Sequence, residues 1–219
     1  CNAGFDLLGD SLANHQQNVY LIMVVSALII SGGLGFIVWR DLLEYHQKKK
    51  ITIHSKIALT VTGTLLLGGF VVFFFTERNG ETLVEGNMFQ RLANTFFMSV
   101  TPRTAGYYSV DYLHMSHAGL ILTMFLMYIG GTSGSTAGGL KTTTLGVLLI
   151  QMRSMLKGRT RAEAFGRTIR QGAVLRALTL FFVTLTLCVV AIMILSVTET
   201  IPKTSGIEYI AFEVFSAFG

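Results

Sequence analysis

The sequence predicts an all-α protein that crosses a membrane several times. Of its 219 residues, 51% are hydrophobic and only 13% are charged, and the mean hydropathy is +0.58. These values lie far from those of soluble globular domains. Residues 15–39, 57–76 and 177–198 contain almost no charged side chains, and each stretch is long enough to cross a bilayer as a helix.

Two shorter helices are predicted to enter the bilayer without crossing it. The first runs from Asn87, a good N-cap residue, to about Val100. About 13 residues at about 1.5 Å each extend only about 20 Å, and a crossing helix needs about 20 residues. The second covers residues 206–218, and a capping-box sequence at residues 205–208 opens it. We expect both to be re-entrant pore helices.

An irregular segment, residues 101–107, follows the first of these helices because Pro102 ends it. Unpaired backbone groups are costly in lipid, so such backbone persists at this depth only where it lines a water-filled path. Gly106 permits a backbone conformation that a Cβ would oppose. The centre of the segment has the composition of a loop that turns carbonyl oxygens toward an ion: Thr104, Ala105, Gly106 and Tyr107. The segment predicts one quarter of an ion pore.

Two further copies of this filter segment are expected. Residues 1–6 also carry Ala-Gly and an aromatic residue before a long uncharged stretch, and the matching positions are Asn2, Ala3, Gly4 and Phe5. A third copy is expected to begin at Gly219, directly after the second pore helix.

The chain therefore contains a repeat of outward helix, pore helix, filter segment and inward helix. Residues 57–158 hold a complete repeat, residues 1–56 hold the filter end and inner helix of the preceding one, and residues 159–219 hold a cytoplasmic link, an outer helix and the next pore helix. Because the chain opens and closes inside motifs, we expect it to be a piece of a longer protein.

The inner helix of the complete repeat is predicted to be broken. Lys141 is the only Asp, Glu, Lys or Arg between Asp111 and Arg153, and that stretch is too long for one straight crossing. Its middle, residues 130–140, is rich in glycine and small hydroxyl residues, which do not sustain a helix. We expect helices over 114–129 and 141–156. A buried lysine beside the break marks a functional site; the alternative is a lysine that only satisfies loop carbonyls.

The sequence of the break partly resembles two enzyme motifs but matches neither. The spacing from Gly134 to Gly139 resembles a phosphate-binding loop, but Lys141 falls one residue late and no strand precedes it. Ser133 resembles the nucleophile of an intramembrane protease, which needs a base, and all five histidines precede it in the chain. The sequence therefore indicates a protein that is not an enzyme.

The net charge of +5 comes mainly from two basic clusters. Positive residues are retained on the cytoplasmic side of membrane proteins, so loops 40–56 and 153–176 are predicted to be cytoplasmic and no nucleic-acid partner is needed to explain the charge. The second cluster consists of Arg153, Lys157, Arg159, Arg161, Arg167, Arg170 and Arg176.

These motifs resemble those of the Trk/Ktr/HKT superfamily of potassium transporters, most closely the Ktr-type membrane subunit. The resemblance covers the whole chain and is carried by four segments: residues 1–6, 101–107, 130–141 and 215–219. It implies a homodimer that takes up K⁺ through a central filter, and it makes this chain the end of the second, all of the third and the front of the fourth of four units.

The resemblance also implies roles for particular residues. Backbone carbonyls of six residues would line the filter and bind K⁺: Asn2, Ala3, Gly4, Thr104, Ala105 and Gly106. An intramembrane gate below the filter would comprise Gly130, Gly131, Gly134, Ser135, Thr136, Gly138, Gly139 and Lys141. A cytoplasmic ring of nucleotide-binding regulatory subunits would dock near Lys48, Lys49, Lys50, Arg159 and Arg161.

No cofactor bound by the chain is expected, with K⁺ as the transported ion and Na⁺ passage left open because each filter copy has a single glycine. Arg103 is expected to point away from the pore and to pair with a carboxylate or a carbonyl, since a cation facing the pore would repel K⁺. The alternative function is a Na⁺-coupled secondary cation transporter with broken helices, which has no need for two re-entrant helices that each lead into a filter segment.

Overall fold

The computed structural model describes residue 9 and residues 11–78, 87–159, 161–199 and 206–219. The helices are α1 (Val19–Lys48), α2 (Ile53–Thr76), α3 (Met88–Val100), α4 (His117–Tyr128), α5 (Thr142–Leu156), α6 (Gln171–Thr198) and α7 (Ile207–Phe218). Short 3₁₀ turns cover Ala13–His15 and Tyr112–His114, and a small hairpin pairs β1 (Glu163–Ala164) with β2 (Arg167–Thr168).

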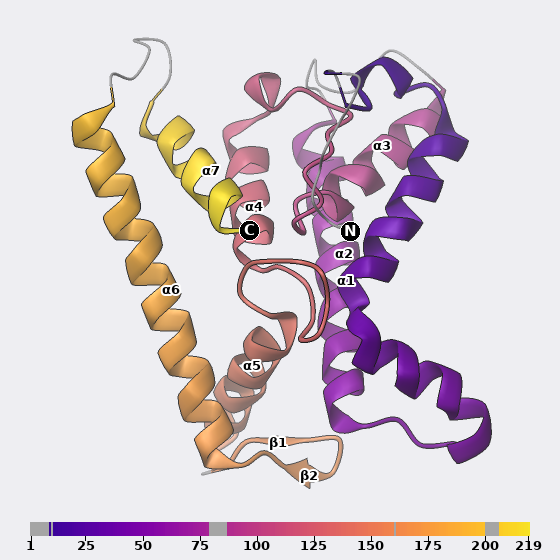
Figure 1. Ribbon diagram of the computed structural model, residues 1–219, viewed down its shortest axis with the longest axis vertical. Coiled ribbons are helices and arrows are strands. Elements are labelled where there is room, and N and C mark those ends of the chain that lie inside the picture. Colours follow the sequence, from indigo (N-terminus) through magenta and orange to yellow (C-terminus); the bar gives the residue numbers. More distant parts are fainter. Residues whose placement is uncertain (1–8, 10, 79–86, 160, 200–205) are drawn as a thin grey trace.

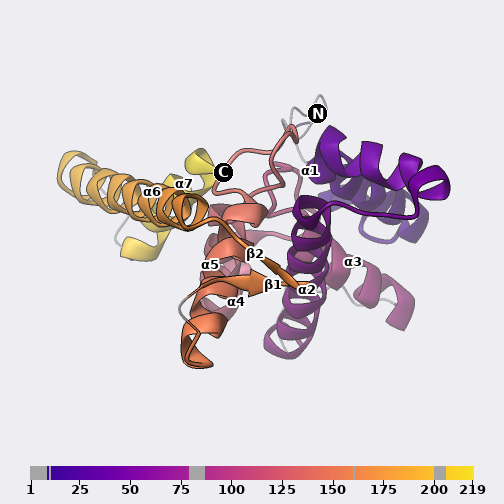
Figure 2. The ribbon, with the colours of Figure 1, turned by 90° about the horizontal axis from the view of Figure 1, so that it is seen from below.

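Within the described residues, three helices are long and apolar enough to cross a membrane, namely α1, α2 and α6. Figure 1 shows them running roughly along the long axis of the molecule, with the short α3 and α7 in its upper half. Seen from below in Figure 2, α6 and α7 lie on one side of α4 and α5, and α1, α2 and α3 lie on the other. The broken crossing formed by α4 and α5 is therefore central.

Helix α1 extends beyond the predicted crossing. It continues to Lys48, and Lys49 ends it in a left-handed conformation. Residues 40–48 are therefore helical, so the prediction of a loop over 40–56 was wrong for most of its length. The helix is interrupted at Gly35 (φ 72°, ψ 158°), and Figure 1 shows its lower half turned aside from the upper half.

A buried carboxylate joins α1 to α2. Asp41 is 6% exposed, and its Oδ2 accepts hydrogen bonds from Ser55 Oγ at 2.6 Å and from the Thr52 amide at 3.2 Å. The Thr52 hydroxyl donates to the same oxygen, and Thr52 is the N-cap of α2. These bonds explain why α2 begins at Ile53, earlier than the predicted 57: its first turn is capped from α1.

Asp41→Ala in the full-length protein is expected to lower the free energy of unfolding by about 1–3 kcal/mol, because the Thr52 amide and the Ser55 hydroxyl lose a buried acceptor. Thermal unfolding in detergent checks this. The matched control is Glu44→Ala, which removes only an exposed pair with Lys48 and is expected to change stability by less than about 1 kcal/mol. Equal effects of the two changes would contradict a structural role for Asp41.

The predicted pore helices are present. Helix α3 begins after Asn87 with a capping box completed by Gln90 and ends at Val100, as the sequence indicated. Helix α7 has Gly206 as its N-cap with no side-chain hydrogen bond, and Ser205, on which the predicted capping box depends, lies outside the described residues. Helix α7 packs against α4 and α6.

The other boundaries shift by small amounts. Helix α4 starts at His117 and ends at Tyr128, α5 starts at Thr142, and α6 starts at Gln171 where 177 was expected. The β1–β2 hairpin between α5 and α6 was not predicted from the sequence. Lys56 lies over the ring of Phe165 in the turn of this hairpin, 5.6 Å from its centroid, so the two basic clusters lie at the same end of the molecule.

Candidate functional site

The predicted filter segment leaves α3 through a turn and then adopts an unusual backbone. Thr104 has φ +64° and Gly106 has φ +75°. Glycine adopts positive φ without a steric penalty, whereas a β-branched residue such as threonine rarely does. The surrounding structure must therefore hold Thr104 in place.

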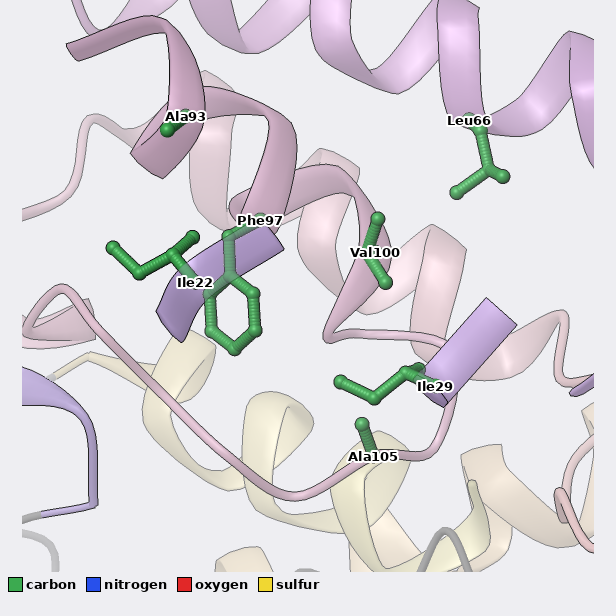
Figure 3. Close-up of a cluster of buried hydrophobic side chains, with 7 residues drawn as sticks. All are labelled: Ile22, Ile29, Leu66, Ala93, Phe97, Val100 and Ala105. Atoms are coloured by element: carbon green, nitrogen blue, oxygen red, sulfur yellow. The ribbon is translucent and has the colours of Figure 1, made fainter. Parts of the chain in front are cut away.

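A hydrophobic cluster supports the segment from one side. Ala105 is fully buried and belongs to a cluster shared by α1, α2 and α3 (Figure 3). The cluster consists of Ile22, Ile29, Leu66, Ala93, Phe97, Val100 and Ala105. Burial of the Ala105 methyl group in this cluster anchors the segment against α1 and α3.

Three consecutive carbonyls of the segment remain uncommitted. The carbonyl of Thr101 accepts from the Ala105 amide at 3.1 Å, and the carbonyl of Tyr107 accepts from the Thr101 hydroxyl. In contrast, the carbonyls of Thr104, Ala105 and Gly106 accept no hydrogen bond within the described part of the chain. Thr104 is partly buried, Ala105 is buried and Gly106 is exposed; because none of the three carbonyls has a partner among the described residues, these oxygens are available to a ligand or to water.

A hollow of about 180 Å³ adjoins the segment. Its lining residues are Thr101, Pro102, Thr104, Gly106, Met127, Ser216 and Gly219. Gly219 lies close enough that an added Cβ would be 3.4 Å from Thr104 Cγ2. The structure therefore brings together two of the three predicted filter copies, and the first copy (Asn2, Ala3, Gly4 and Phe5) lies outside the described residues.

Arg103 points away from this hollow, as predicted. It is 6% exposed, and its Nη2 donates to the Thr62 hydroxyl and to the Gly130 carbonyl, each at 3.4 Å. Its partners are thus a hydroxyl, which was not predicted, and a carbonyl, one of the two predicted alternatives. Through Gly130, Arg103 connects the filter segment to the start of the 130–140 loop.

The 130–140 loop brings the ends of α4 and α5 together. The amide of Gly130 donates to the Leu140 carbonyl at 3.0 Å, and the amide of Leu140 donates to the Tyr128 carbonyl at 2.9 Å. Lys141 Nζ donates to the carbonyls of Ala137 (2.6 Å) and Gly138 (3.5 Å). The lysine therefore holds the second half of the loop.

The loop also contacts the filter segment directly. The amide of Gly138 donates to Thr104 Oγ1 at 3.2 Å, while Arg103 binds the carbonyl of Gly130. Both ends of the loop are thus tied to adjacent residues of the filter segment. This juxtaposition explains how the strained backbone of Thr104 is held.

The remaining predicted gate residues occupy the middle of the loop. Gly134 and Gly139 have positive φ, +80° and +65°, Ser135 Oγ donates to the Thr132 carbonyl at 2.7 Å, and Thr136 is exposed. Thr132 is fully buried; sequence reasoning did not select it, and its place amid glycines on the loop was the only signal. Ser133 hydrogen-bonds to the hydroxyl of Thr143 at 2.9 Å.

The C-terminal end of α1 and the β1–β2 hairpin lie at the lower end of the molecule in Figure 1, and the predicted docking residues are in or next to these two elements in the chain. Lys48, Lys49 and Lys50 are exposed, and Arg159 pairs with Glu163 at 2.5 Å. Arg161 is also exposed. Their common position agrees with a single cytoplasmic face.

Comparisons with known proteins agree with this architecture. The family model TrkH, described as cation transport protein, matches residues 1–219. The potassium/sodium uptake protein NtpJ of Enterococcus hirae is 84% identical over 219 residues, which are 100% of this chain and 49% of that protein. The Ktr system potassium uptake protein B of Bacillus subtilis is 35% identical over 221 residues, 100% of this chain and 48% of that protein.

A solved structure, that of the potassium transporter TrkH from Vibrio parahaemolyticus, matches with a TM-score of 0.73 at 14% sequence identity and covers 99% of this chain and 53% of that one. The predicted fold class, a multi-spanning helical membrane protein with pore-helix repeats, is thereby confirmed. The chain spans about half the length of the curated relatives it matches.

Proposed function

Because this chain belongs to the TrkH family of cation transport proteins, we propose that it forms part of the ion-translocating subunit of a potassium uptake system. The observation that carries the proposal is the run of three uncommitted carbonyls at Thr104, Ala105 and Gly106. Carbonyl oxygens arranged in this way replace the hydration shell of K⁺. The names of the similar uptake proteins from Enterococcus hirae and Bacillus subtilis support potassium as the ion.

In this proposal the chain supplies parts of three of four units around one pore. Residues 1–56 are the end of the second unit, 57–158 the third, and 159–219 the front of the fourth. The carbonyls of Asn2, Ala3 and Gly4 form the matching layer in the second unit. Gly219 begins the fourth filter segment, and its position beside Thr104 supports this arrangement.

Selectivity for K⁺ over Na⁺ is proposed to be moderate. The filter segment has one glycine, Gly106, with positive φ, and the other unusual φ belongs to Thr104, which is held by a hydrogen bond to the 130–140 loop. We expect a filter segment with one glycine, held by side-chain contacts, to discriminate between ions of different size less strictly than a segment with two glycines. The name of the 84% identical protein includes sodium as well as potassium.

The 130–140 loop is proposed to be the gate. Its residues Gly130 and Gly138 contact the filter segment, and Lys141 binds two of its carbonyls. We also propose that the full-length protein is a homodimer and that a ring of nucleotide-binding regulatory subunits docks on the basic face. The docking residues would be Lys48, Lys49, Lys50, Arg159 and Arg161.

A Na⁺-coupled secondary transporter is the second candidate. Broken helices and a lysine at the break also occur in transporters of that type. The two short helices α3 and α7, whose C-terminal ends meet at one hollow, favour the pore instead, because two re-entrant helices that converge in this way are the arrangement of a channel.

The test is K⁺ uptake by a potassium-uptake-deficient host that expresses the full-length protein, with and without Gly106→Ser. Serine at φ +75° meets the cost of the left-handed conformation, about 1–2 kcal/mol, and the segment must turn its carbonyls to relieve it. We expect the apparent affinity for K⁺ to fall by about tenfold or more, or Na⁺ to be admitted.

The matched control is Gly63→Ser, a glycine of α2 with open space beside it, which is expected to leave uptake unchanged. Normal affinity and selectivity in Gly106→Ser would exclude residues 104–107 as the selectivity element. Failure of the unaltered protein to restore growth at low K⁺ would contradict the proposed function itself.

A further inference from the structure

The interruption of α1 faces the 130–140 loop. At Gly35 the backbone leaves the helical conformation (φ 72°, ψ 158°), so nearby backbone groups lose their partners within the helix. The loop supplies replacements: the Thr132 amide donates to the Gly33 carbonyl at 2.9 Å, and the Phe36 amide donates to the Gly134 carbonyl at 3.2 Å. The Thr132 hydroxyl donates to the Leu34 carbonyl.

Each interrupted segment therefore supplies hydrogen-bond partners for backbone groups of the other. Residues 33–36 of α1 and residues 132–134 of the loop are about one hundred positions apart in the chain, as the separation of 98 between Leu34 and Thr132 records. Both lie within membrane-crossing elements, where an unpaired backbone group is costly. Each break therefore depends on the other for partners of the backbone groups that it leaves free.

The contact leaves no space for larger residues. A Cβ at Gly35 would lie 2.8 Å from the carbonyl carbon and oxygen of Gly134 and from the amide of Ser135. A Cβ at Gly134 would lie 2.9 Å from the ring of Phe36. The Thr132 side chain enters the contact through its hydroxyl, and it is fully buried.

We propose that residues 33–36 of α1 form a latch that holds the 130–140 loop against the filter segment, with Thr132 as its positioning residue. The proposal rests on the proposed function, since it assigns a role to α1 in the gate. To leave this position the loop must break its three hydrogen bonds to α1. The carbonyls of Gly33 and Leu34 then need water in place of Thr132, so release of the loop admits water at the α1 break.

Amide hydrogen exchange in the full-length protein tests the latch without depending on transport. Thr132→Val keeps the shape of the side chain and removes only the donor to Leu34. We expect the amides of Phe36 and of residues 132–135 to exchange about tenfold faster in this variant, as the loss of one buried hydrogen bond predicts, and amides in α2 to be unchanged. Unchanged exchange at Phe36 would overturn the proposal.

Two further variants separate the hydroxyl from general packing. Thr132→Ser keeps the hydroxyl and is expected to restore slow exchange at Phe36. Thr64→Val removes a hydroxyl that bonds only within α2 and is expected to leave exchange at Phe36 at the level of the unaltered protein. If Thr132→Ser exchanges as fast as Thr132→Val, the hydrogen bond to Leu34 is not what holds the loop.

The consequence for gating is measured as Rb⁺ flux into liposomes that contain the full-length protein alone. Thr132→Val is expected to raise this flux about tenfold, because the loop loses one of the hydrogen bonds that hold it in place. A conducting protein in which Thr132→Val leaves the flux unchanged or lower would overturn the gating role of the latch. A protein without any K⁺ or Rb⁺ flux would instead contradict the proposed function, and the exchange measurement would still decide the latch.

Discussion

Gly130→Ala is expected to lower the unfolding temperature of the full-length protein more than the other substitutions proposed above. The new Cβ would overlap the carbonyl oxygen of Gly138 and would lie 2.7 Å from its carbonyl carbon. Both atoms belong to the backbone, and Lys141 and Thr104 hold the same residue. The loop must move as a whole, and we expect a loss of stability of more than about 3 kcal/mol.

The control for this prediction is a substitution that is expected to raise stability. Gly63→Ala adds the same methyl group inside α2, where nothing lies within 4 Å, and replacing glycine within a helix stabilises by about 0.5–1 kcal/mol. Thermal unfolding of both variants in detergent gives the comparison. If Gly130→Ala unfolds at the same temperature as the unaltered protein, the close approach of Gly130 to Gly138 is not maintained in the native state.

Arg103→Ala is expected to abolish most K⁺ uptake and to destabilise the protein by about 2–5 kcal/mol, the range for truncation of a large buried side chain. The change opens a cavity behind the filter segment and leaves the Thr62 hydroxyl and the Gly130 carbonyl without their donor. The backbone of Thr104, at φ +64°, then loses the support on which its conformation depends.

Arg103→Met separates volume from hydrogen bonding. Methionine fills much of the space beside Ile29, Leu66 and Val100, so stability is expected to recover in part while K⁺ uptake stays at least about tenfold below that of the unaltered protein, because the link to Gly130 is missing. Uptake by the host and thermal unfolding are measured together. Normal uptake in Arg103→Met would show that the guanidinium contributes volume alone.

Arg91→Met is the matched control for this pair. Arg91 lies in the pore helix α3, but it is exposed, and among the described residues its Nη2 donates to the carbonyl of Arg78. Its replacement is expected to change neither stability nor uptake beyond small amounts.

Local sequence determined the elements of this fold. The uncharged runs at 57–76 and 177–198 became α2 and α6, and the short run after Asn87 became α3, because the length of an apolar stretch and its cap are properties of the stretch itself. The position of Gly106 at a positive φ followed from its place in residues 101–107. The glycine content of 130–140 was sufficient to predict the break between α4 and α5.

Tertiary structure decided how these elements are joined. The interruption of α1 at Gly35 is held by partners from a distant segment: the Gly134 carbonyl accepts from the Phe36 amide, and Thr132 donates to the carbonyls of Gly33 and Leu34. Helix α2 begins at Ile53, earlier than the sequence predicted, because Asp41 of α1 accepts hydrogen bonds from Thr52 and Ser55.

The same distinction holds at the candidate site. The sequence indicated that Arg103 must turn away from the pore, but both a carboxylate and a carbonyl remained open as its partner. The choice of Gly130, and the hydrogen bond between Gly138 and Thr104, depend on where the 130–140 loop lies in space. The length of an apolar stretch and its capping residues are properties of one segment, so the sequence of that segment predicts them. Hydrogen bonds between two interrupted segments form only once the fold has brought the segments together.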